Sequence, residues 1–149
     1  MSVGHSGLPT IPNYKLFSDI SVDTRICGGV IVYIKNNIAN HVFQIKYNTC
    51  YISFRLDFCP ELIFIGTYIQ PESSKYFSPN MFADVASLLI DCKEKLLTPM
   101  IGGDFNSRPG DINQFSDMNY TSNIDKTSNN HGTTYFSDIC KSGDIFSLN

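Results

Sequence analysis

The middle of this 149-residue sequence predicts a strand, a helix and a second strand in succession. Residues 61–69 are almost continuously apolar, which is typical of a strand that is buried on both faces. Ser78 and Pro79 then supply a helix N-cap and a first-turn proline, and residues 100–103 resume as a short apolar strand. Because two strands joined by a helix normally lie parallel in one sheet, this segment predicts a βαβ unit and an α/β fold.

The helix of this unit is predicted over residues 78–97, and Thr98-Pro99 is expected to end it. Its apolar residues recur at intervals of three and four positions, so they form one face that packs into the core. The members of this face are Phe82, Val85, Ala86, Leu89, Cys92 and Leu96.

Four strands are predicted before this unit. The segment 14–20 alternates weakly, whereas 27–35 is rich in β-branched residues and ends at Asn36-Asn37. The segment 41–46 alternates and is expected to pair with 50–56.

After the unit, residues 105–131 form a long polar loop at a strand end, where α/β proteins place function. Residues 133–142 are predicted as a short helix with Gly143 as its stop, and 145–148 begin another strand. With no internal repeat or linker, residues 1–149 are assigned to a single, partial domain.

Composition excludes several classes of protein. A hydrophobic content of 42% with 17% charged residues is typical of a globular chain. The net charge is −3, and the only arginines are Arg25, Arg55 and Arg108, so the basic patch of a typical nucleic-acid binder is missing. Tight DNA binding would therefore need a local basic groove or a bound divalent ion.

Cysteine usage and the N-terminus indicate an intracellular protein of the nucleus or cytoplasm. The number of cysteines is odd and no CxxC pair occurs, which predicts reduced thiols without a disulfide framework or a zinc site. Residues 1–5 lack the pattern of a signal peptide, and the apolar runs are too short to span a bilayer. The cysteines are Cys27, Cys50, Cys59, Cys92 and Cys140.

The stretch Gly102-Gly103-Asp104-Phe105-Asn106 stands at the end of the second strand of the unit. The two glycines allow a tight turn and close approach of a ligand. Asp104 is suited to hold a proton or a metal ion, and Asn106 to donate hydrogen bonds to a phosphoryl oxygen. The same residues also suit a polar turn that caps a strand.

Four stretches in this order resemble the endonuclease/exonuclease/phosphatase superfamily and, more narrowly, the apurinic-type endonuclease domain of non-LTR retrotransposons. The resemblance covers roughly residues 14–149. The four stretches are Arg25-Ile26-Cys27-Gly28-Gly29-Val30 with Tyr33; Gly66-Thr67-Tyr68-Ile69-Gln70-Pro71; Gly102 to Arg108; and Asn130-His131-Gly132 followed by Cys140 and Leu148-Asn149.

The resemblance implies a four-layer α/β sandwich of the DNase I-like kind and a phosphodiesterase that uses Mg²⁺ or Mn²⁺ to nick DNA. It implies that Asp104 orients or deprotonates the attacking water and contacts the metal through water. It implies that Asn106 and Tyr68 contact the scissile phosphate, although Tyr68 also suits a core position with its hydroxyl satisfied. Within the enzyme class, a phosphatase or sphingomyelinase-like relative is the alternative.

The sequence also departs from the family pattern. The metal-binding Glu of the family lies upstream of the Gly-Gly-Val strand, and this chain has no Glu before Glu61. The Ser-Asp-His motif that ends the family domain is also missing. The expectation is an incomplete domain, truncated at both ends, whose activity is impaired. The alternative is a catalytically inactive mobile-element remnant or binding module.

Three further residues of the four stretches are expected to have structural or solvent-exposed roles and no catalytic one. Arg108 is expected to be solvated, although it is placed to contact a DNA phosphate. Asn130 is expected to serve a turn, and His131 is expected to be exposed in the polar loop.

Overall fold

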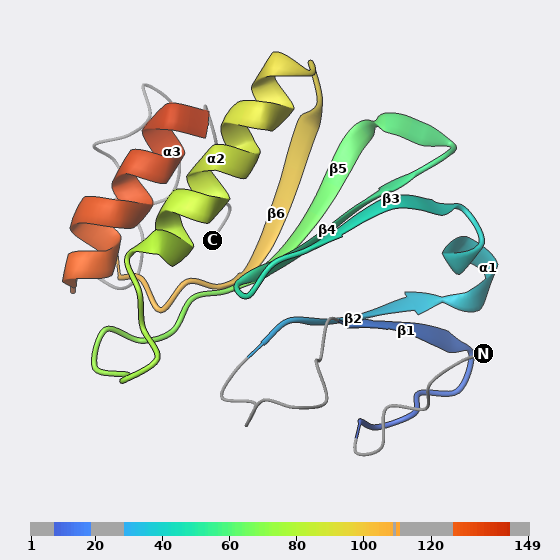
Figure 1. The fold of residues 1–149 in the computed structure, drawn as a ribbon, viewed down its shortest axis with the longest axis horizontal. Coiled ribbons are helices and arrows are strands. Elements are labelled where there is room, and N and C mark those ends of the chain that lie inside the picture. The colour runs from blue at the N-terminus through green and yellow to red at the C-terminus, as the bar shows by residue number, and fades with distance from the viewer. Residues whose placement is uncertain (1–7, 19–28, 109, 111–126, 144–149) are drawn as a thin grey trace.

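The computed structural model describes residues 8–18, 29–108, 110 and 127–143 (Figure 1). The elements in chain order are β1 (Tyr14–Ser18), β2 (Ile31–Lys35), α1 (Asn36–Ala39), β3 (Val42–Tyr47), β4 (Tyr51–Leu56), β5 (Cys59–Tyr68), α2 (Asn80–Glu94), β6 (Thr98–Asp104), the π-helical segment η2 (His131–Phe136) and α3 (Ser137–Gly143).

The described strands form two sheets. β1 and β2 pair antiparallel, and the second sheet has the order β3-β4-β5-β6. The pairs β3–β4 and β4–β5 are antiparallel, whereas β5 and β6 are parallel and are connected through α2. The predicted βαβ unit is therefore confirmed, and so is the pairing of the segments 41–46 and 50–56.

Helices lie on one side of the four-stranded sheet, and the smaller sheet lies on the other side and covers that face only in part. α2 covers one face with α3 beside it, and β1 and β2 lie on the opposite side (Figure 1). Gly66 of β5 lies on that opposite face, where an added Cβ would lie 3.2 Å from Val30 Cγ1 and 3.6 Å from Val32 Cγ2. Because Gly66 has no side chain, the segment around β2 can approach β5 closely. The described elements form a mixed α/β fold.

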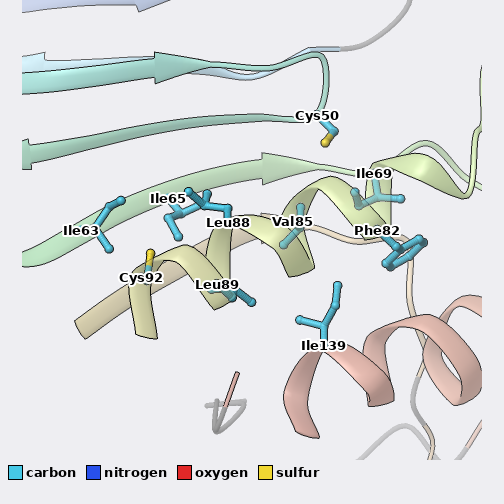
Figure 2. Close-up of a cluster of buried hydrophobic side chains, with 10 residues drawn as sticks. All are labelled: Cys50, Ile63, Ile65, Ile69, Phe82, Val85, Leu88, Leu89, Cys92 and Ile139. Atoms are coloured by element: carbon cyan, nitrogen blue, oxygen red, sulfur yellow. The ribbon is translucent and has the colours of Figure 1, made fainter. Parts of the chain in front are cut away.

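The core lies between β5 and the two helices (Figure 2). From Leu62 to Tyr68, half-buried and buried residues of β5 alternate, so the prediction that 61–69 is buried on both faces was wrong for one of the faces. The strand has one face against α2 and a second face that the smaller sheet covers only in part. The buried cluster consists of Cys50, Ile63, Ile65, Ile69, Phe82, Val85, Leu88, Leu89, Cys92 and Ile139.

α2 ends at Glu94, three residues earlier than predicted. The N–H of Leu97 donates to the carbonyl of Cys92, and the N–H of Leu96 donates to that of Lys93. This is the Schellman arrangement, which needs a left-handed residue after the helix, and Leu96 has a φ of 55°. Leu96 is consequently 89% exposed, and its assignment to the apolar face was wrong.

Other boundaries also differ from the predictions. β6 is longer than predicted because Thr98 and Pro99 belong to it, and an unpredicted short helix, α1, follows β2 directly. The predicted helix 133–142 is found as η2 followed by α3, which includes Gly143. Residues 19–20, 27–28 and 145–148, which were predicted in strands, lie outside the described residues.

Within the described part of the chain, no helix is long and apolar enough to cross a membrane. Cys50, Cys59, Cys92 and Cys140 carry free thiols, and Cys27 lies outside the described residues.

Candidate functional site

The end of β6 is held tightly against β5. Gly103 has a φ of 146°, and an added Cβ there would lie 1.9 Å from the carbonyl oxygen of Thr67. One residue further, the carbonyl of Asp104 accepts the N–H of Ile69 at 2.8 Å, and Asp104 pairs in register with Tyr68. The close contact at Gly103 therefore fixes the backbone position from which the Asp104 side chain extends.

Asp104 and Asn106 form one hydrogen-bonded turn. The Asn106 N–H donates to Asp104 Oδ1 at 2.8 Å, and Asn106 Nδ2 donates to the carbonyl of Ile69 at 2.8 Å. Asp104 Oδ2 makes no hydrogen bond within the described residues, and the Asn106 amide has a second N–H. The residues thus serve as a strand-capping turn and still present one oxygen and one N–H to a ligand.

This turn lines a cleft of about 700 Å³. Residues 71–73, in the loop that follows β5, form one part of the described wall. The other described wall residues are Asp104, 106–108 and Asn129. Both Asp104 and Asn106 therefore line the same cleft.

Three of the described residues that line the cleft are charged, namely Glu72, Asp104 and Arg108. Glu72 Oε1 accepts a hydrogen bond from Asn130 Nδ2 at 3.2 Å. Arg108 is exposed, as expected, and its guanidinium forms no ion pair with the described residues. With two carboxylates and one guanidinium, the cleft does not attract an anion unless a cation is added.

Tyr68 lies at the end of β5, the strand that pairs with β6. It is half-buried, and it pairs in register with Asp104, so the two side chains lie on the same face of the sheet. It is not among the described residues that line the cleft, and its phosphate contact stays a prediction.

Asn129 is a site residue that sequence reasoning missed. Its side chain accepts the N–H groups of Arg108 and Gly132 and donates to the carbonyl of Asn106. Two consecutive asparagines before His-Gly signal a turn, but this pattern does not show which asparagine faces the loop after β6. Asn130, which the sequence analysis singled out, is exposed immediately before η2.

His131 is buried, and the prediction of an exposed histidine was wrong. The side chain is 0% exposed, and its ring centroid lies 4.5 Å from that of Phe77 and 5.1 Å from that of Phe82. Both ring nitrogens are without a hydrogen-bond partner among the described residues. η2 begins at His131 and packs this side chain into the aromatic core, so His131 is not placed to exchange protons with a ligand in the cleft.

The buried thiols do not supply an alternative nucleophile. Burial raises the pKa of the Cys50 thiol from 9.0 to about 12, with a further contribution from Asp84. Burial also raises the pKa values of Cys92 and Cys140. These thiols are protonated at neutral pH, whereas the thiolate is the reactive form.

The oxygen atoms of the cleft fit a magnesium-type ion better than a zinc-type ion. Mg²⁺ keeps several waters and is usually bound through one or two carboxylates, and the cleft offers those of Asp104 and Glu72. Among the described residues there is no group of three or more His, Cys, Asp or Glu side chains that could hold a metal. Asp104 and Glu72 are the two carboxylates among the described residues that line the cleft and could contact such an ion.

No protein-family model matches this chain, and neither a curated protein nor a solved structure matches it.

Proposed function

We propose that this chain is an endonuclease-like domain of the endonuclease/exonuclease/phosphatase type, which hydrolyses a DNA phosphodiester with Mg²⁺ or Mn²⁺. One observation carries the proposal. Asp104 and Asn106 both line a strand-end cleft, and the turn that holds them is fixed by two hydrogen bonds of 2.8 Å.

The packing of the sheets supports a four-layer α/β sandwich as the complete architecture. Val30 and Val32 lie against Gly66 on one face of the larger sheet, and α2 covers the other face. In such a sandwich β1 and β2 belong to one inner layer and β3 to β6 belong to the other.

Each group in the cleft has a defined part in phosphodiester hydrolysis. Asp104 orients or deprotonates the attacking water through Oδ2, and Asn106 donates a hydrogen bond to a phosphoryl oxygen. Arg108 offsets part of the phosphate charge. Asp104 and Glu72 are the carboxylates that would contact a divalent ion, and such an ion would supply positive charge beside the phosphoryl group.

A binding module that does not cleave its ligand is the second candidate. The observation that favours it is the complete burial of His131, which leaves no histidine among the residues that line the described cleft. Because catalytic groups act as a unit, we expect cleavage by this chain to be slow.

Asp104→Asn is expected to lower Mg²⁺-dependent nicking of supercoiled plasmid by about 100-fold or more, the range of a lost general base. The amide keeps an oxygen for the Asn106 N–H but loses the basic Oδ2. The matched control is Asp138→Asn, which removes an exposed carboxylate of α3.

Equal Mg²⁺-dependent nicking by the wild type and Asp104→Asn would contradict the assignment of Asp104. A wild-type protein that binds DNA without nicking it would favour the binding module.

A further inference from the structure

Asn129 connects the loop after β6 to the helical part of the chain. Its Oδ1 accepts the N–H of Arg108 and the N–H of Gly132, both at 2.8 Å. Its Nδ2 donates to the carbonyl oxygen of Asn106 at 2.9 Å. Three of the four hydrogen bonds available to a side-chain amide are therefore made, and two of them hold the residues that line the cleft.

The backbone of Asn129 strengthens this connection. Its N–H donates to the carbonyl of Arg108 at 3.0 Å, so both backbone polar groups of Arg108 are bonded to Asn129. Its carbonyl accepts the N–H of Thr133 at 2.9 Å and the Thr133 hydroxyl at 3.0 Å. Arg108 is thus fixed at its backbone while its guanidinium remains exposed at the cleft.

The conformation of Asn106 explains why this connection matters. Asn106 has a φ of 47°, a left-handed conformation that asparagine tolerates better than most residues other than glycine. Its N–H and its side chain are bonded to Asp104 and to Ile69 of the β-sheet region. The donor from Asn129 is the third restraint, and it acts on the carbonyl that sets the direction of the chain toward Arg108.

We propose that Asn129 is the positioning residue of the site. It holds the Asn106 amide and the Arg108 guanidinium where both can contact the same phosphodiester. This inference rests on the proposed function, and it goes beyond it by assigning a role to a residue outside the Gly-Gly-Asp-Phe-Asn motif. Asn129 acts through the two residues that it holds.

Two substitutions separate positioning from stability. Asn129→Asp keeps an oxygen that accepts from Arg108 and Gly132 but loses the donor to Asn106, whereas Asn129→Ala loses all three side-chain bonds. Ser128→Asp and Ser128→Ala are the matched controls, because Ser128 is exposed and adjacent, and the aspartate variant adds the same charge.

The readouts are binding of a double-stranded DNA oligonucleotide in Mg²⁺ by fluorescence anisotropy, kcat and KM for plasmid nicking, and the thermal midpoint. We expect both Asn129 variants to lose tenfold to about 100-fold in kcat/KM per folded molecule, as misplaced reacting groups do. Both are also expected to bind the oligonucleotide more weakly than the wild type and the Ser128 controls. Asn129→Asp is expected to keep a thermal midpoint closer to that of the wild type than Asn129→Ala does.

Wild-type binding and nicking by both Asn129 variants, corrected for the folded fraction, would overturn the inference. An equal loss in Ser128→Asp would also overturn it, because charge alone would then account for the effect. If the wild type binds the oligonucleotide but does not nick, and only the Asn129 variants bind weakly, the proposed hydrolysis fails while the positioning role stands.

Discussion

Gly103→Ala is expected to lower the free energy of unfolding by about 3 kcal/mol or more, since backbone strain and overpacking each cost roughly 1–3 kcal/mol. The added Cβ would lie 1.9 Å from the carbonyl oxygen of Thr67, and the φ of 146° disfavours any side chain. The neighbouring atom belongs to the backbone of β5, so it moves only if the β5–β6 pairing opens. Urea unfolding followed by circular dichroism measures this loss.

Gly102→Ala is the matched control for this prediction. An added Cβ at Gly102 meets no heavy atom within 4 Å, and alanine in a strand is favoured over glycine by roughly 0.5–1 kcal/mol. We therefore expect the stability of this variant to be unchanged or slightly raised. Similar losses at both glycines would show that the close approach of β6 to β5 at Gly103 is not as described.

Phe82→Ala is expected to cost about 3–5 kcal/mol of unfolding free energy, the usual range for a buried phenylalanine. Phe82 is 3% exposed, and its ring stacks on Tyr135 at a centroid distance of 4.9 Å and meets His131 edge to face at 5.1 Å. The substitution leaves a cavity between α2 and η2. Because domains of this kind are stable by only about 5–15 kcal/mol, this loss is a substantial part of the total stability.

The control for Phe82→Ala lies on the same helix. Ile90 is 48% exposed, so Ile90→Ala removes little buried surface and is expected to change stability by about 0.5 kcal/mol or less. Thermal and urea unfolding of both variants provide the comparison. A loss at Ile90 as large as that at Phe82 would contradict the assignment of the buried face of α2.

The sequence was sufficient to predict the βαβ unit, because its signals are local. Apolar residues at every second or at every third and fourth position report burial directly, and Val85, Leu89 and Cys92 are buried as the spacing indicated. The end of α2 was not predictable in the same way. Leu96 continues the helical spacing of apolar residues. However, its left-handed backbone and the Schellman hydrogen bonds of Leu96 and Leu97 end the helix and turn the chain toward β6.

The site was predictable only where its residues are adjacent in sequence. Asp104 and Asn106 stand two positions apart at a strand end, and they share the cleft. Asn129 and Arg108 are separated by 21 positions, so their hydrogen bonds leave no local pattern. The burial of His131 was likewise hidden, because it depends on aromatic contacts with Phe77 and Phe82 from other elements.

Paramagnetic broadening by Mn²⁺ tests most directly whether the strand end at Asp104 holds the divalent ion of a phosphodiester hydrolase, and it does not depend on the rate of cleavage. In the ¹⁵N-labelled wild-type protein, Mn²⁺ is predicted to broaden the backbone amide signals of residues 104–108 and of Glu72 first. In Asp104→Asn this selective broadening is predicted to disappear, while Asp138→Asn behaves as the wild type. Broadening centred on other residues, or unchanged broadening in Asp104→Asn, would contradict a cation site at the end of β6.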